Sequence, residues 1–303
     1  MAAVQAVPLA AVGLPVFGRS DAVSAFAAHV QAVRSHIAGP ALLVYPEIHL
    51  FGTEGRPAAE QKRLLTSAAE PLDGELVKQL GAIARDAGAW LVPGSVCELN
   101  PEGEPFNTAV VFSPDGELVG TYRKIFPWRP YEPFTPGGRF VTVDIPDTGR
   151  IGLSICYDAW FPEVSRHLAW MGADVIVNVV KTTTPDRTQE VVLARANSIA
   201  NQVFTVSVNC AGPVGMGRSL IVDPEGAVLQ ECADATPGVL YQTLDLDRVD
   251  RVREIGTAGT NRMWAQFLPT DTPLELPLYS GRIHPNDWTP SNHRVADTTS
   301  RTR

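Results

Sequence analysis

The stretch IGLSICYDAWFPE, residues 151–163, ends an apolar run on a cysteine and places acidic residues just beyond it. Residues 151–155 have the composition of a buried β-strand, and Pro162 suits the first turn of a following helix. Cys156 is therefore expected at a strand-to-helix turn. A cysteine in this position is either an ordinary core residue or a nucleophile, and the strand alone does not decide between them.

The pattern around this stretch alternates β-type apolar runs with amphipathic runs of helical spacing. The turns at residues 114–116 and 224–226 each carry proline and glycine and predict two hairpins. Together these elements predict a mixed sheet covered by helices, with enough strands for two sheets packed face to face. The predicted helices span 21–38, 73–89, 162–173 and 187–202, and the predicted strands 41–47, 90–96, 107–113, 116–124, 150–158, 174–180, 203–209, 219–232 (a hairpin) and 238–247.

The composition of the chain excludes several classes of protein. Its 303 residues are 45% hydrophobic and 19% charged, which is typical of a globular protein with a large core. The formal charge of −8 and the scattered basic residues argue against a nucleic-acid or anionic-membrane partner. Four cysteines without paired spacing indicate neither a disulfide framework nor a zinc site. The apolar first residues carry no Lys or Arg before Arg19, and no apolar run reaches membrane-span length, so we expect a cytoplasmic location.

Three reactive residues each follow a β-type run: Glu47, Lys124 and Cys156. Functional groups in open α/β sheets gather outside the strand ends. A thiol that attacks, a carboxylate that takes its proton and an ammonium that stabilises an oxyanion would form a coherent catalytic set. Taken singly, such a cysteine is most often a core residue and the other two are most often solvated, so spacing alone leaves the set open.

The local contexts of these residues resemble the three signature stretches of the nitrilase superfamily of carbon–nitrogen hydrolases. The matching stretches occur in the family's order, and the resemblance covers residues 8–265. It implies an α/β fold, an α-β-β-α sandwich of two mixed sheets covered by helices, and a Glu47–Lys124–Cys156 triad. The stretches are YPE at 45–47, YRKIFPW at 122–128 and GLSICYDAWFPE at 152–163.

The resemblance also implies a second glutamate near the lysine. Glu132, in PWRPYEPFTPG at residues 127–137, falls where that residue would lie. The same stretch is similar to the aliphatic amidase and formamidase branch. The resemblance assigns residues 1–267 to a carbon–nitrogen hydrolase domain. Residues 268–303, with Pro-rich and polar clusters and little periodicity, are expected to form a C-terminal extension that wraps around the domain or is partly disordered.

Residues near the nucleophile bear on the substrate class. Relatives that hydrolyse nitriles typically carry Trp and Glu after the cysteine, whereas this chain has Tyr157 and Asp158, which favours an amide or carbamoyl amide. Asp158 is a candidate either for orienting the site or for capping the turn. Lys181 and Thr182, with Thr183, are candidates for lining a polar acyl pocket, and an exposed loop without a role is the alternative.

These observations predict a thiol amidohydrolase that cleaves a small non-peptide amide to a carboxylate and ammonia or an amine through a cysteine thioester. Hydrolysis of an N-carbamoyl amine, hydrolysis of a nitrile and acyl transfer would use the same triad, and a non-catalytic binding protein is the alternative of another class. We expect no metal or organic cofactor, and a homo-oligomer, as is common among relatives. The remaining cysteines are interpreted as core residues, and the histidines His49 and His167 as packing or surface residues.

Overall fold

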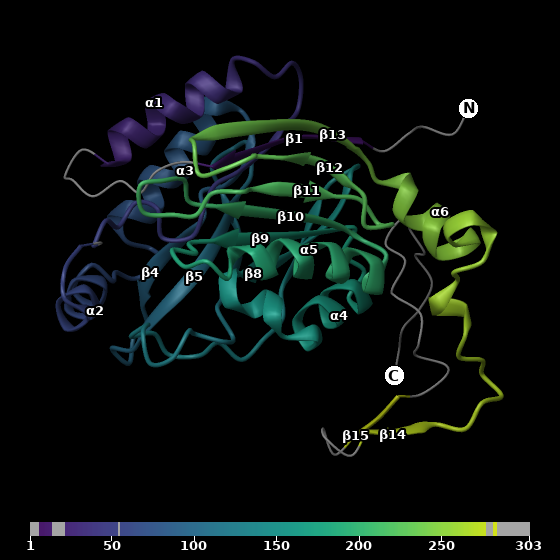
Figure 1. The fold of residues 1–303 in the computed structure, drawn as a ribbon. Helices are drawn as coiled ribbons and strands as arrows, with labels where there is room; N and C mark the ends of the chain where they lie inside the picture. The colour runs from purple at the N-terminus through teal and green to yellow at the C-terminus, as the bar shows by residue number, and fades with distance from the viewer. Residues whose placement is uncertain (1–5, 14–21, 54, 277–280, 284–303) are drawn as a thin grey trace.

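The computed structural model describes residues 6–13, 22–53, 55–276 and 281–283. Two mixed sheets pack face to face, with helices on their outer faces (Figure 1). The 7-stranded sheet has the order β13-β1-β2-β3-β5-β4, with β6 paired to β5. Its strands are β1 (Ala6–Gly13), β2 (Leu42–Val44), β3 (Trp90–Val92), β4 (Ser95–Leu99), β5 (Pro105–Phe112), β6 (Leu118–Arg123) and β13 (Gly238–Asp245).

The 6-stranded sheet has the order β12-β11-β10-β9-β8-β7 and carries the cysteine turn at the end of β8. β8 is parallel to β9, and β9 is parallel to β10, so the carboxyl ends of these three strands lie at one edge. The strands are β7 (Thr142–Ile145), β8 (Gly149–Ile155), β9 (Val175–Val180), β10 (Phe204–Asn209), β11 (Leu220–Val222) and β12 (Val228–Glu231).

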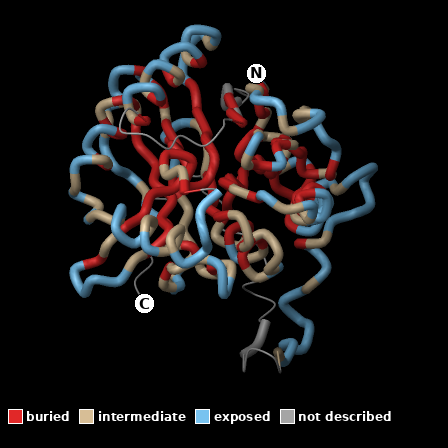
Figure 2. The backbone as a smooth tube through the Cα atoms, turned by 60° about the vertical axis from the view of Figure 1, so that its left-hand side comes forward, coloured by how far each residue is buried: buried red, intermediate tan, exposed pale blue. Residues whose placement is uncertain are grey.

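Alternation along the strands explains the layers. In β2, Leu42 and Val44 belong to the core between the two sheets, whereas Leu43 faces the helices on the outside. Helices α1 (Ala22–Arg34) and α3 (Glu75–Ala87) share that outer core with the first sheet. Helices α4 (Pro162–Trp170) and α5 (Arg187–Asn201) pack on the second sheet. Figure 2 shows the buried residues concentrated in the middle of the molecule and the exposed ones on its outer surface. The predicted α-β-β-α sandwich is confirmed.

The structure differs from the sequence-based elements at a few places. The predicted strand 90–96 is split into β3 and β4 at Gly94, which has φ +90° and would bring a Cβ to 1.8 Å from the carbonyl oxygen of Pro46. The predicted strand 150–158 stops at Ile155 because the next residues form a short 3₁₀ turn, η1 (Cys156–Trp160). The sequence patterns missed β7, α2 (Ala58–Ser67) and α6 (Asp247–Ile255).

In the C-terminal segment, β14 (Leu274–Leu276) pairs antiparallel with β15 (Gly281–Ile283). Residues 277–280 and 284–303 lie outside the described residues, so the division at residue 267 and the wrapping or disordered extension stay predictions. Among the described helices, none is both long and apolar enough to span a membrane.

Candidate active site

The cysteine turn is held by a buried carboxylate. Cys156 follows β8, begins η1 and has φ +47°. The Asp158 carboxylate accepts hydrogen bonds from Tyr122 Oη at 2.7 Å, Phe126 N at 2.9 Å and Ile155 N at 3.0 Å. Burial raises the pKa of Asp158 to about 6, against the opposing effects of nearby Lys124 and these hydrogen bonds. Asp158 therefore links the turn in the second sheet to the end of β6 in the first.

A buried lysine lies between two carboxylates beside this turn. Lys124 Nζ is 2.7 Å from Glu132 Oε1 and 3.0 Å from Glu47 Oε1, and the lysine side chain has no exposed surface. Asn107 Nδ2 donates to Glu47 Oε1 at 2.8 Å, and Trp128 N donates to Glu132 Oε2 at 3.1 Å. Both carboxylates are thus fixed by further hydrogen bonds. The structure brings together Glu47, Lys124 and Glu132 as the sequence predicted.

The charges in this cluster act on one another. Burial opposes the charged form of Lys124, but Glu132 and Glu47 outweigh it and raise the pKa of Lys124 well above its ordinary value. Burial raises the pKa of Glu132 despite the attraction of Lys124, and Glu47 adds to the rise. Burial and then Glu47 raise the pKa of the Cys156 thiol well above its ordinary value, with Lys124 opposing them. Burial and Glu47 therefore favour the neutral thiol of Cys156 over its thiolate.

On its other side, Cys156 contacts the segment after β9. Cys156 Sγ lies 3.8 Å from Thr182 Oγ1, and Thr182 Oγ1 donates to both carboxylate oxygens of Glu190 at 2.8 and 2.7 Å. Glu190 also pairs with Arg187, whose Nη1 is 3.1 Å from Glu190 Oε2. The sequence patterns did not predict this pair, because two charged residues three apart on a helix are usually exposed to solvent.

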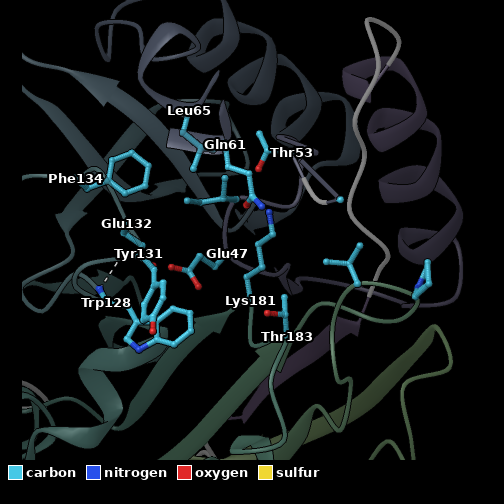
Figure 3. Close-up of a pocket in the computed structure, with 14 residues that line it drawn as sticks. Glu47, Thr53, Gln61, Leu65, Trp128, Tyr131, Glu132, Phe134, Lys181 and Thr183 are labelled. Carbon is cyan, nitrogen blue, oxygen red and sulfur yellow. Dashed lines mark hydrogen bonds between the residues drawn. The ribbon is translucent and has the colours of Figure 1, made fainter. Parts of the chain in front are cut away.

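A pocket of about 470 Å³ opens beside the carboxylates. Glu47 and Glu132 line it together with the aromatic side chains of Trp128 and Tyr131, and Lys181 rises along the facing wall (Figure 3). The other described lining residues are Ile48, Thr53, Gly55, Gln61, Leu65, Phe134, Thr183, Pro213 and Val214.

Some of the residues predicted to bind substrate line this pocket and others do not. Lys181 and Thr183 line it, and Lys181 Nζ donates to the carbonyl oxygen of Phe51 at 3.4 Å. Tyr157, Asp158 and Thr182 are not among the described lining residues. Asp158 and Thr182 are instead buried and bonded around the cysteine turn, so substrate binding by these three residues stays a prediction.

The remaining candidates lie apart from the pocket lining. His49 is buried, its Nε2 is 2.8 Å from the Pro93 carbonyl oxygen, and burial lowers its pKa to about 3. His167 is exposed and stacks on Phe140. Cys97 and Cys210 are buried, and Cys232 is half-buried. Within the described part of the chain, no three His, Cys, Asp or Glu side chains converge in a metal-binding group.

The family model of carbon–nitrogen hydrolases matches residues 2–254. The chain belongs to the carbon–nitrogen hydrolase family. Among curated relatives of this carbon–nitrogen hydrolase, the formamidase of Pseudomonas syringae pv. tomato is 33% identical over 221 residues, which cover 71% of this chain and 62% of the relative. The formamidase of Bacillus cereus strain B4264 is 33% identical over 206 residues, 66% of this chain and 60% of the relative. The chain thus spans about six-tenths of the length of these curated relatives.

Solved structures share the fold of this chain. Nit3 of Saccharomyces cerevisiae, a member of branch 10 of the nitrilase superfamily, has a TM-score of 0.75 and 24% identity, covering 86% of this carbon–nitrogen hydrolase and 97% of Nit3. A mutant amidase of Nesterenkonia sp. AN1 in complex with butyramide has a TM-score of 0.65 and 25% identity, covering 81% and 94% of the two chains. The predicted membership of the nitrilase superfamily is confirmed.

Proposed function

We propose that this carbon–nitrogen hydrolase is a thiol amidohydrolase that cleaves a small non-peptide amide to a carboxylate and ammonia or an amine. The observation that carries the proposal is the lysine held between two carboxylates, at 2.7 and 3.0 Å, beside a half-buried cysteine at a strand end. The matching formamidases and the butyramide-bound amidase support an amide as the substrate.

In the proposed reaction, Cys156 adds to the amide carbon while Glu47 takes the thiol proton. Lys124 and the backbone N–H of Tyr157 stabilise the oxyanion that forms. Glu47 then returns the proton to the leaving nitrogen, the carbon–nitrogen bond breaks, and a thioester remains. Water activated by Glu47 or Glu132 hydrolyses the thioester, which releases the carboxylate and restores the thiol. The residues of this chain are sufficient for every step, without a metal or organic cofactor.

The raised pKa of Cys156 explains why the proposal needs a general base. A thiol that is neutral at pH 7 is a poor nucleophile until its proton is removed. Glu47 is fixed by Lys124 and Asn107, so its carboxylate is held in one direction rather than left mobile. The triad of Glu47, Lys124 and Cys156, with Glu132 beside it, accounts for proton removal and charge stabilisation together.

The pocket supports a substrate larger than formamide. Formamide has only three heavy atoms, whereas about 470 Å³ falls within the range of about 300–1,000 Å³ typical of sites for larger ligands. Aromatic and polar residues share the pocket lining, which suits an acyl group with both apolar and polar parts. We propose that the enzyme works in the cytoplasm as a homo-oligomer, as its composition and its resemblance to the nitrilase superfamily lead us to expect.

The decisive experiment compares wild type, Cys156→Ala and Cys232→Ala in release of ammonia from propionamide. We expect Cys156→Ala to abolish turnover with the fold intact, whereas Cys232→Ala, which removes the other half-buried thiol, should behave as wild type. Iodoacetamide should label Cys156 before the other three cysteines. Turnover by Cys156→Ala, or equal labelling of all four thiols, would overturn the assignment of the nucleophile.

A matched nitrile separates amide hydrolysis from nitrile hydrolysis by the same triad. With propionitrile in place of propionamide, we expect kcat/KM to fall by at least about 100-fold, or about 2.7 kcal/mol. The reason is that a nitrile nitrogen must be protonated and released in two stages, whereas the proposed base protonates an amide nitrogen once. A nitrile that is the better substrate would contradict the amidohydrolase proposal, and hydroxamate formation with hydroxylamine at the expense of hydrolysis would indicate acyl transfer.

A further inference from the structure

The buried ion pair of Arg187 and Glu190 has no part in the proposed reaction. The hydroxyl of Thr182 connects this pair to the Cys156 thiol by hydrogen bonds. This row of hydrogen-bonded side chains begins at Cys156 Sγ, 3.8 Å from Thr182 Oγ1. It continues to Glu190, which receives the Thr182 hydroxyl on both carboxylate oxygens, and ends at Arg187, 3.1 Å from Glu190. The side chains of Arg187 and Glu190 are only 2% and 7% exposed, so water does not compete for these bonds.

The chemistry of the groups fixes the direction of every hydrogen bond in this row. Arg187 only donates, and a glutamate bonded to a guanidinium is ionised and only accepts. Thr182 has a single hydroxyl proton, which its geometry gives to Glu190. The oxygen lone pairs of Thr182 are therefore what faces Cys156. A neutral thiol can donate its S–H to those lone pairs, whereas a thiolate in the same place would be repelled by them.

The surrounding bonds prevent Thr182 from turning away. Thr182 N donates to Asn209 Oδ1 at 2.9 Å, and Asn209 Nδ2 donates to the Gly217 carbonyl at 3.0 Å. Arg187 is held in turn, since its Nε donates to the same Gly217 carbonyl at 3.1 Å and its Nη1 to Ser207 Oγ at 3.1 Å. All of these polar side chains are buried. The Thr182 hydroxyl is thus a fixed acceptor for the thiol.

Charged groups from several elements influence the Cys156 thiol electrostatically. Glu47 follows β2, Lys124 follows β6, Glu132 lies in the loop beyond Lys124, and Glu190 with Arg187 lies on α5. Burial and then Glu47 raise the pKa of the thiol, Lys124 lowers it, and Glu190 and Glu132 add smaller increases. Glu190 is therefore one of the groups that disfavour the thiolate.

We infer that Thr182 accepts the proton of the resting Cys156 thiol, and that Glu190, fixed by Arg187, is a positioning residue that orients the Thr182 hydroxyl for this purpose. The inference rests on the proposed role of Cys156 as the nucleophile. The free enzyme then keeps a neutral and oriented thiol, and Glu47 removes the proton when a substrate carbonyl is in place. Because the thiolate is the form that alkylating agents and oxidants attack, Cys156 reacts more slowly with them than it would without the contact to Thr182. Thr182 in this role acts on the thiol rather than on the acyl group.

The S–H stretching band of Cys156 tests the contact directly. The band is isolated as the infrared difference between wild type and Cys156→Ala, because the other three thiols cancel. We expect Thr182→Val, which keeps the shape of the side chain but removes the acceptor, to move the band to higher frequency. Thr182→Ser should restore the wild-type position, and Thr188→Val, at an exposed threonine of α5, should leave it unchanged. A band that stays in place in Thr182→Val would overturn the inference.

The pH profile of alkylation tests the role of Glu190. In Glu190→Gln one negative charge is removed and the Thr182 hydroxyl becomes able to donate to a thiolate. We expect the midpoint of Cys156 alkylation to fall by about one pH unit, with about tenfold faster labelling below the midpoint. A midpoint that is unchanged or higher in folded Glu190→Gln would overturn the inference. If this variant does not fold because Arg187 has lost its partner, the infrared comparison of Thr182→Val and Thr182→Ser still tests the inference.

Failure of this inference can be told apart from failure of the proposed function. Both measurements are made without substrate and report only on the Cys156 thiol. If Cys156→Ala retains propionamide hydrolysis, the function is refuted whatever the infrared band does. If Cys156→Ala is inactive and the S–H band stays in place in Thr182→Val, the proposed function stands and the role of Thr182 is refuted.

Discussion

Two buried ionic clusters act on Cys156, and they differ in what they can offer to a reaction. The first places Lys124 between Glu47 and Glu132, so it has one carboxylate in excess, and Glu132 is 18% exposed to the pocket. The second balances Arg187 against Glu190, and both side chains are almost fully enclosed. An excess carboxylate beside a pocket can exchange protons with a substrate, whereas a balanced, enclosed pair can only fix the geometry of its neighbours.

Removing the cation of the pocket-side cluster should have the largest effect. Lys124→Met leaves two buried carboxylates without their partner, and we expect the free energy of unfolding to fall by about 3–5 kcal/mol. Loss of the proposed oxyanion donor should also lower kcat/KM for propionamide by about 1,000-fold in the folded fraction. Urea denaturation and turnover measure the two effects.

The exposed Lys78 on α3 provides the matched control, because Lys78→Met removes an equal charge outside the site. A folded Lys124→Met protein with turnover within tenfold of wild type would show that the pocket-side cluster is structural, and would remove the contrast between the two clusters.

Asp158 is a third buried carboxylate near Cys156, and unlike Glu47 and Glu190 it is held by a phenol and two backbone amides rather than by a cation. Its pKa is about 6 in the folded protein against an ordinary value of 3.8, so the folded state binds the proton more tightly. The resulting stability is present below about pH 4 and is lost as the pH rises to about 6, a change of about 3 kcal/mol.

Denaturation of wild type and Asp158→Ala across this pH range measures that loss. We expect the stability advantage of wild type to shrink between about pH 4 and about pH 6 and then to remain constant. An advantage that grows with pH would mean that the pKa of Asp158 is lowered, as it would be for a carboxylate governed by a cation.

The smallest effect should come from Glu132→Gln, which keeps the hydrogen-bonding shape of the side chain but removes its charge. We expect kcat/KM for propionamide to fall by about 100-fold, or about 2.7 kcal/mol, because Glu132 holds Lys124 and is, in the proposed reaction, one of the two carboxylates that can activate water. Iodoacetamide labelling of Cys156 should persist, since the thiol and Glu47 remain. Glu102→Gln, at an exposed glutamate, is the control. Turnover equal to wild type would reduce Glu132 to a structural partner of the lysine.

The sequence predicted the pocket-side cluster but not the enclosed one, and the reason is physical. Glu47, Lys124 and Cys156 each follow a strand, and strand ends can be located from apolar runs, but it was the resemblance to the nitrilase superfamily that singled these residues out and added Glu132. The Thr182–Glu190 contact depends on how α5 is rotated against β10, and a buried charge on a helix looks like a solvated one in sequence. Asn107 was missed for a similar reason, since its side chain meets Glu47 across 60 positions of sequence.

For the fold, too, features set by local sequence were predicted and features set by contacts between distant residues were not. The helices and strands with long, regular periodicity, such as α5 and β9, were predicted within a few residues. The break between β3 and β4 was missed, because it depends on the close approach of Gly94 to Pro46, which are far apart in the chain. The short elements β7 and α6 were also missed, since four or nine residues give little periodicity to recognise.

The positive φ of Cys156 has a consequence for the history of the protein. A residue with a Cβ in the left-handed region costs about 1–2 kcal/mol, and glycine would avoid that cost at this position. Selection for thermal stability alone would therefore favour Cys156→Gly, a variant without the thiol. Relief of this strain would remove the proposed nucleophile, so stability and the proposed activity compete at a single backbone dihedral.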